Sequence, residues 1–263
     1  MCSINHDLKA IFIHVPKTGG RYIEYILHKY YGFTVMESKN EMQNMFNDID
    51  DIDLSDLEYI LYSSKEYPLT ISKKGLFRYY SMSEYINKKF NMDNDKWKNY
   101  YKFTFVRNPY DRLFSSWKYC ITKGRCFTNF KDYIFTNYKN FENHIDFNNK
   151  NYIYLHGFIS QYEQLVNKYK RLDIDFIGRF EKINDDLNII LSHLGIKNIL
   201  HIHELQNNIK INETNMYINN IQTYYFDQYD DSMLSKVNDL FFNDFKVFNY
   251  KICETTTELL EKN

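Results

Sequence analysis

Three short apolar runs mark the 263-residue chain, and each is followed by a segment with helical spacing. The runs are residues 9–15 (KAIFIHV), 100–106 (YYKFTFV) and 173–178 (DIDFIG). Phe, Ile and Val dominate these runs, which is typical of strands that are buried on both faces of a parallel sheet. The pattern therefore predicts three buried strands.

The segments that follow the runs predict helices. Apolar side chains recur at intervals of three and four over residues 22–30 and 183–194, and Gly195 is a good helix terminator. After the second run, Asn108-Pro109 is typical of an N-cap and a first helical residue. Strands that alternate with helices predict an α/β fold, with a central parallel sheet flanked by helices.

The chain is expected to form a single domain over residues 1–263, because no Pro-, Gly- or Ser-rich linker and no internal repeat divides it. Residues 37–63 are acidic and residues 137–151 are rich in Asn, so both are interpreted as insertions or surface loops. The acidic stretch lacks the Gly and the terminal Glu of a calcium loop. The last ~10 residues are expected to fray.

Composition and charge limit the kinds of partner. Hydrophobic residues make up 44% and charged residues 25%, as in globular proteins. The formal net charge of -1 argues against nucleic acid as a partner, so any anion site must be local. No apolar run approaches the ~18 residues of a membrane span, and the N-terminal run is too short for a signal peptide.

Four cysteines are present, at positions 2, 120, 126 and 253, and their spacing is not that of a zinc site. A bond between Cys120 and Cys126 is one interpretation, but free buried thiols in a reducing compartment are favoured. Together with the absence of a signal or membrane pattern, this predicts a soluble, cytoplasmic protein.

The residues after the first expected strand have the chemistry of an anion-binding loop. Gly19 and Gly20 allow a close backbone approach and a sharp turn into the helix, whose first N–H groups favour a phosphate or sulfate. Lys17 adds a positive charge, Thr18 a hydroxyl donor and Arg21 a further donor. The alternative is a tight turn with an exposed lysine, but the position between strand and helix favours an anion site.

A second constellation follows the second expected strand. Steps of four place Arg107, Asp111 and Ser115 on one side of the helix, where a guanidinium and a hydroxyl can bind a second phosphate. The alternative is an Arg107–Asp111 ion pair that caps the helix beside an idle serine. These residues alone leave both interpretations open.

Together, the two constellations resemble the sulfotransferases that use 3′-phosphoadenosine-5′-phosphosulfate (PAPS). The chain resembles in particular the carbohydrate group, which includes the heparan sulfate 2-O- and 6-O-sulfotransferases and their bacterial relatives. Residues 11–20 (IFIHVPKTGG) resemble the loop for the 5′-phosphosulfate, and residues 103–117 (FTFVRNPYDRLFSSW) the 3′-phosphate segment. Residues 175–196 and 245–250 resemble later elements of the family.

The resemblance implies a P-loop-like three-layer fold, PAPS as the sulfate donor and a carbohydrate hydroxyl as the acceptor. The residues that it implies for the 5′-phosphate and the sulfuryl bridge are Lys17, Thr18, Gly19 and Gly20. It implies Arg107 and Ser115 for the 3′-phosphate. The family often has Thr at the position of Arg21, so that a contact from Arg21 is a separate prediction.

Sulfuryl transfer by an in-line attack rests mainly on positioning and electrostatics, and Lys17 is predicted to stabilise the leaving phosphate. No metal is expected, because the site supplies its own positive charge. The family often has a histidine base between the two motifs, in a pattern like His-Ala-Ser/Thr-Ala-x-Glu, where this chain has Tyr79, a poor base with a pKa of about 10. His14 is the alternative catalytic base, unless it fills a structural place in the core.

Two other functions remain under consideration. A nucleotide or sugar kinase of the P-loop type would use similar loop geometry. The chain, however, lacks the Gly-x-x-x-x-Gly-Lys-Ser/Thr loop and an obvious magnesium-binding Asp at a strand end. The other alternative is a sulfotransferase-like nucleotide-binding protein that lacks activity.

Overall fold

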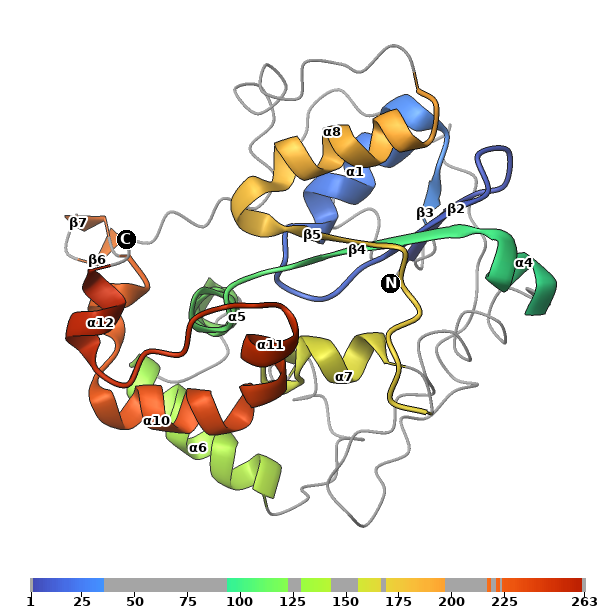
Figure 1. Cartoon of the computed structure of the whole chain (residues 1–263). Coiled ribbons are helices and arrows are strands. Elements are labelled where there is room, and N and C mark those ends of the chain that lie inside the picture. The colour runs from blue at the N-terminus through green and yellow to red at the C-terminus, as the bar shows by residue number, and fades with distance from the viewer. Residues whose placement is uncertain are drawn as a thin grey trace. The chain divides into compact units, whose positions relative to one another are not determined.

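The computed structural model describes residues 2–35, 94–122, 129–142, 156–166, 169–196, 217–218, 221–222 and 224–261 (Figure 1). The chain divides into two compact units. The described residues of the first unit are 2–35, 94–106 and 169–196, and the remainder belong to the second unit. The chain passes from the first unit to the second between Val106 and Arg107.

The first unit contains a five-stranded sheet with the order β3-β1-β2-β4-β5. The strands are β1 (Cys2–Asn5), β2 (Ala10–Ile13), β3 (Thr34–Val35), β4 (Tyr101–Val106) and β5 (Phe176–Arg179). The three strands predicted from the apolar runs are β2, β4 and β5, and they are parallel to one another, as predicted.

The sheet as a whole is mixed, which corrects the prediction of a parallel sheet. β1 is antiparallel to β2, and β3 is antiparallel to β1. The reason is the short connection between β1 and β2, since a tight turn can join only antiparallel neighbours. Lys9 adopts a φ of 48° in this turn, and the Asn5 Oδ1 atom accepts a hydrogen bond of 2.8 Å from the Leu8 N–H.

Helices α1 (Gly20–Tyr31) and α8 (Ile183–His193) lie side by side on one face of this sheet (Figure 1). Both helices were predicted from apolar spacing, and Gly195 follows α8 with a φ of 75°, as a helix terminator does. Phe12, Phe103 and Phe105 form the sheet side of the core. The helices contribute Ile23, Tyr25, Ile26, Leu27, Leu187, Ile190 and Leu191.

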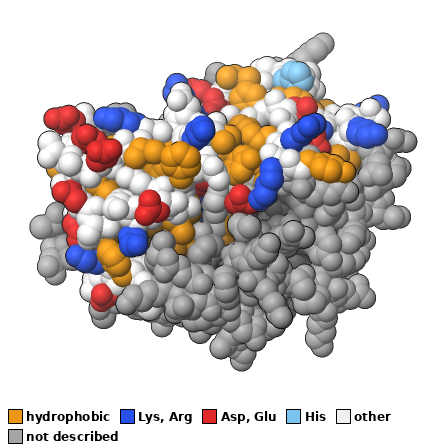
Figure 2. Space-filling view, turned by 60° about the horizontal axis from the view of Figure 1, so that its bottom comes forward, with side chains coloured by type: hydrophobic (Ala, Val, Ile, Leu, Met, Phe, Trp, Pro, Cys, Tyr) orange, Lys and Arg blue, Asp and Glu red, His pale blue; other side chains and the backbone are white. Residues whose placement is uncertain are grey.

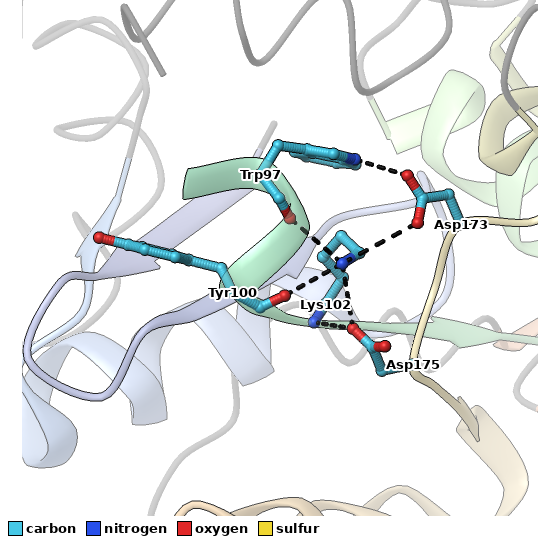
Figure 3. Close-up of polar contacts among 5 residues, drawn as sticks. All are labelled: Trp97, Tyr100, Lys102, Asp173 and Asp175. Atoms are coloured by element: carbon cyan, nitrogen blue, oxygen red, sulfur yellow. Dashed lines mark hydrogen bonds and ion pairs between the residues drawn. The ribbon is translucent and has the colours of Figure 1, made fainter. Parts of the chain in front are cut away.

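A buried lysine secures the amino end of β4 (Figure 3). The Lys102 Nζ atom lies 3.0 Å from the Tyr100 carbonyl oxygen, 3.2 Å from that of Trp97 and 3.3 Å from Asp175 Oδ2. The Trp97 indole donates a 2.6 Å hydrogen bond to Asp173. This cluster joins helix α4 (Asn94–Asn99) to the segment that enters β5. Because its charge is compensated and it lies at the opposite end of β4 from Arg107, Lys102 has a structural role.

The second unit is helical with an aromatic core. Its elements are α5 (Pro109–Thr122), α6 (Phe130–Glu142), η3 (His156–Phe158), α7 (Gln161–Leu165), η5 (Phe226–Gln228), α10 (Asp231–Leu240), α11 (Phe242–Val247) and α12 (Thr256–Leu260). Strands β6 (Tyr217–Ile218) and β7 (Ile221–Gln222) form a separate antiparallel pair. Core side chains include Tyr110, Phe114, Trp117, Phe130, Tyr133 and Phe245.

The structure corrects the start of the surface loop that was predicted at 137–151, because helix α6 extends to Glu142. Residues 143–151, and all of the stretch 37–63, lie outside the described residues. Within the last ten residues, Thr256–Leu260 form α12. Cys120 and Cys253 are free and buried, whereas Cys126 lies outside the described residues.

The surface of the described residues carries mixed charge. On the face shown in Figure 2, Lys and Arg side chains are interspersed with Asp and Glu side chains. None of the helices in the described ranges has the length and apolar character needed to cross a membrane.

Candidate functional site

The loop between β2 and α1 has a strained backbone at its predicted anion-binding lysine. Lys17 adopts a φ of 70° and Gly19 a φ of 79°, both in the left-handed region. This conformation is disfavoured for a side-chain-bearing residue by roughly 1–2 kcal/mol, and such outliers often lie at ligand sites. Lys17 is half-buried. The loop thus holds a lysine in the left-handed region, as the turn between β1 and β2 does at Lys9.

Thr18 shapes this loop from within. Its side chain is fully buried, and its hydroxyl donates a 2.7 Å hydrogen bond to the Val15 carbonyl oxygen. The sequence predicted a hydroxyl donor to a bound anion, whereas in the structure this hydroxyl bonds to the backbone. The contribution of Thr18 to an anion site would therefore come from its backbone and from the turn that it stabilises.

The two glycines are required for different reasons. A Cβ atom on Gly19 would lie 2.8 Å from Ile183 Cδ1 and 3.0 Å from Phe180 Cδ2, so the loop packs closely against the start of α8. Gly20 is the first residue of α1, and a Cβ atom there would lie 2.1 Å from Cδ2 of the His14 ring. Only glycine fits at either position without displacement of these neighbours.

The amino end of α1 is suited to an anion. Within the described structure it has no side-chain cap and no acidic residue in its first turn. The first N–H groups of a helix lack intrahelical partners and carry partial positive charge, so they attract phosphate and sulfate. Arg21, in the first turn, is half-buried. The predicted placement of the loop between a strand and a helix is confirmed.

His14 lies in the core, which is the structural alternative that the sequence left open. Its side chain is 4% exposed, and its ring stacks on Phe12 with the centroids 6.1 Å apart. The Nδ1 atom lies 3.1 Å from Glu24 Oε2, although these atoms do not meet in hydrogen-bond geometry. The contact is an ion pair only when the His14 ring is protonated. Whether His14 also acts as a base stays a prediction.

Sequence analysis missed Glu24. Glu24 lies on α1 between the buried residues Ile23 and Tyr25 and is itself fully buried. Burial of an acidic side chain is costly unless a partner compensates its charge. The signal in the sequence was therefore an acidic residue within the apolar face of a predicted helix.

The second constellation begins directly after β4, in the second unit. The Arg107 Nε atom donates a 2.7 Å hydrogen bond to Asp111 Oδ2, so the ion pair considered in the sequence is present. This bond engages one of the five N–H donors of a guanidinium. The Asn108 side chain caps α5 through the Tyr110 N–H at 3.0 Å, as predicted. Ser115, one turn beyond Asp111, is half-buried.

Lys118 is a further cation near Arg107 that the sequence analysis did not identify. Burial lowers the pKa of Lys118, and the positive charge of Arg107 lowers it further, whereas Asp111 opposes the change. The electrostatic influence of Arg107 indicates that two cations share this part of the second unit. Lys118 lies three residues after Ser115, about one helical turn, and this spacing was the available signal for a cation on the same side of the helix.

Other predicted site features have no described geometry. Tyr79 lies outside the described residues. In the described ranges, no three His, Cys, Asp or Glu side chains gather in a way that could hold a metal ion. The described site features are an anion-ready loop in the first unit and, in the second, the Arg107–Asp111 pair with Ser115 and Lys118 on the helix that follows.

Comparison with known families identifies one match. A family model described as the sulfotransferase family matches residues 2–251, which include the Lys17–Gly20 loop and the segment that contains Arg107 and Ser115. Neither the search of curated proteins nor that of solved structures finds a significant match for the chain.

Proposed function

The chain belongs to the sulfotransferase family, and we propose that it transfers the sulfuryl group of PAPS to a hydroxyl group of a carbohydrate. The family match supports sulfuryl transfer in general, as a transferase of the EC 2.8.2 type. The observation that carries the proposal is the left-handed Lys17–Gly19 loop, which leads into the uncapped start of α1.

In this proposal, the loop binds the 5′-phosphosulfate end of PAPS. The backbone N–H groups of Thr18, Gly19 and Gly20 would bond to the phosphate oxygens, supported by the partial positive charge at the start of α1. Arg21 supplies a further donor from the first turn. The left-handed backbone at Lys17 supports this assignment together with the adjacent helix start, because strained residues cluster at ligand sites.

Lys17 has the main chemical role. As the acceptor oxygen attacks sulfur in line, the bond from sulfur to the bridging oxygen breaks and negative charge builds on the departing 5′-phosphate. The ammonium group of Lys17 would stabilise that charge, and stabilisation of this kind is commonly the largest contribution to catalysis. The proton of the acceptor hydroxyl must go to a base, and His14 is our candidate among the described residues.

Arg107 and Ser115 would bind the 3′-phosphate of PAPS. A guanidinium offers two parallel N–H donors to a phosphate, which suits a dianion better than a single ammonium does. The nearby cation Lys118 supports the choice of an anionic ligand. The proposal also includes a P-loop-like three-layer fold, one domain over residues 1–263 and a cytoplasmic location. The single family match over residues 2–251 supports one domain.

A second candidate function is a nucleotide-binding protein of this family without transferase activity. The burial of His14 beside Glu24 favours it, because a base with a ring that is 4% exposed has little access to an acceptor. Loss of a general base would lower the rate by about 10²–10⁴-fold. Nucleotide binding would be retained.

Calorimetry with adenosine 3′,5′-bisphosphate, and separately with ATP and magnesium, tests the nucleotide site. We expect the bisphosphate to bind more tightly, and tighter binding of ATP would refute the proposal. Transfer of labelled sulfate from PAPS to a panel of glycans then separates an active enzyme from a binding protein. Lys17→Ala should abolish transfer. Lys29→Ala, at the exposed far end of α1, is the matched control and should retain it.

A further inference from the structure

The side-chain amide of Gln161 holds both backbone polar groups of Arg107. The Arg107 N–H donates to Gln161 Oε1 at 2.9 Å, and Gln161 Nε2 donates to the Arg107 carbonyl oxygen at 2.8 Å. Arg107 follows the last residue of β4 and precedes α5, so it belongs to neither element. Gln161 is fully buried at the start of α7. One amide thus holds the peptide groups on both sides of the Arg107 Cα atom.

Asp244 of α11 in turn holds Gln161. The Asp244 Oδ2 atom accepts hydrogen bonds from the Gln161 N–H at 2.9 Å and from Gln161 Nε2 at 3.4 Å. Its Oδ1 atom accepts from Ser160 Oγ at 2.5 Å and from the Tyr162 N–H at 2.8 Å. Asp244 is fully buried, so these donors replace the water that its carboxylate loses.

A second contact supports the same arrangement from α5. Arg112 is 1% exposed, and its Nη1 atom donates to the Ile159 carbonyl oxygen at 3.0 Å. The charge of Arg112 also acts on Asp244, where it opposes the rise in pKa that burial causes. The start of α7 is therefore held both by α11 and by the helix that follows Arg107.

We propose that Gln161 and Asp244 are positioning residues for Arg107. They fix the Arg107 main chain, and so the point from which its side chain extends toward the ligand. This inference rests on the proposed role of Arg107 in binding the 3′-phosphate. A forked guanidinium–phosphate contact is directional, and a misplacement of about 1 Å can weaken such an interaction severely. Gln161 needs both its acceptor and its donor for this task, so an apolar side chain of similar length cannot replace it.

The same helix provides a matched control. Gln164 is also buried, and its Nε2 atom donates to the carbonyl oxygens of Ile159 and Ser160 at 3.2 and 3.3 Å. These bonds are local to α7 and the residues just before it. Gln161→Met and Gln164→Met each remove one buried amide from α7, but only the first removes the bonds to Arg107.

The test is calorimetry with adenosine 3′,5′-bisphosphate on the full-length wild type and both variants, together with amide hydrogen exchange at Arg107. Loss of the bonds to Arg107 should weaken bisphosphate binding about tenfold or more in Gln161→Met, with an affinity within about twofold of wild type in Gln164→Met. Exchange at the Arg107 amide should be faster only in Gln161→Met. The KM for PAPS should rise while that for the acceptor stays unchanged, a split that general destabilisation would not produce.

Equal bisphosphate affinity in the two glutamine variants would overturn the inference, provided that the wild type binds the ligand. A wild type that does not bind the bisphosphate would overturn the proposed function itself, and the positioning role with it. If Gln161→Met fails to fold, Asp244→Asn serves instead. This variant keeps the Gln161 amide but places an NH₂ group against N–H and O–H donors that bond to the Asp244 carboxylate. It should therefore weaken bisphosphate binding by several fold. Unchanged affinity in Asp244→Asn would then refute the role of Asp244.

Discussion

Adding one methyl group at Gly20 tests whether the His14 ring determines the start of α1. Gly20 is helical, so the left-handed backbone of Lys17 and Gly19 does not extend to it. An alanine Cβ atom at this position would lie 2.1 Å from Cδ2 and 2.2 Å from Nε2 of His14. The effect of Gly20→Ala should therefore come from this one contact.

The size of the effect follows from how far the ring must move. Ordinary contact begins at 3.4 Å, so the ring must retreat by 1.3 Å from a separation of 2.1 Å. The ring is buried between Phe12 and Glu24, which oppose this movement. Overpacking of this kind costs about 1–3 kcal/mol, and the higher helix propensity of alanine returns up to about 1 kcal/mol. We expect a net loss of about 1 kcal/mol in the free energy of unfolding.

Urea unfolding of Gly20→Ala, His14→Ala and the double variant measures the interaction as a double-mutant cycle. His14→Ala leaves Glu24 buried beside an emptied space, but this cost is common to the single and double variants and cancels. The cycle should give a coupling energy of about 2 kcal/mol, because alanine at position 20 meets no ring once His14 is truncated.

Gly195→Ala is the control, since its φ is 75° and a Cβ atom there has nothing within 4 Å. It should lose stability through its backbone conformation alone, by the same amount with or without His14. A coupling energy below about 0.5 kcal/mol between positions 14 and 20 would refute the reasoning. In that case, the ring would not contact the start of α1.

Three further predictions concern charged residues. Lys17→Gly should be more stable than Lys17→Ala in urea unfolding by about 0.5–1 kcal/mol, because glycine accepts the left-handed backbone. Both variants should lose sulfuryl transfer. Equal stability of the two variants would argue against strain at this position. Binding of adenosine 3′,5′-bisphosphate should weaken as pH rises through the lowered pKa of Lys118, since the anion prefers the protonated amine. Calorimetry of Lys118→Met should show a weaker dependence of the bisphosphate affinity on pH. Partial burial acts to raise the pKa of Asp230, but hydrogen bonds from Lys131, Ser232 and the Met233 N–H outweigh it and lower the pKa from 3.8 to about 2. The stability from this group should be complete above pH 3.8 and lost as pH falls through about 2. Because the Lys131–Asp230 pair is exposed, the loss should stay below about 1 kcal/mol, and Asp230→Asn, which keeps a helix cap, should lack it in acid titrations followed by circular dichroism.

The sequence alone was sufficient for the parallel core of the first unit. Each of β2, β4 and β5 is a continuous apolar run, and such runs are informative because strands buried on both faces have no polar positions. The helices after them carry local signals as well, such as the Asn108 cap and the glycine after α8. The sequence also placed the Lys17–Gly20 loop between a strand and a helix, since glycine marks positions where the backbone turns sharply.

Only the tertiary structure decided how β1 and β3 pair, because both are too short to show a hydrophobic period. It also decided the surroundings of His14, which depend on the packing of α1 against the sheet and on the buried carboxylate of Glu24. Gln161 lies 54 residues from Arg107, and Asp244 lies 83 residues from Gln161. A hydrogen bond between such distant positions leaves no spacing pattern along the chain, so the residues that hold Arg107 became visible only when the chain was folded.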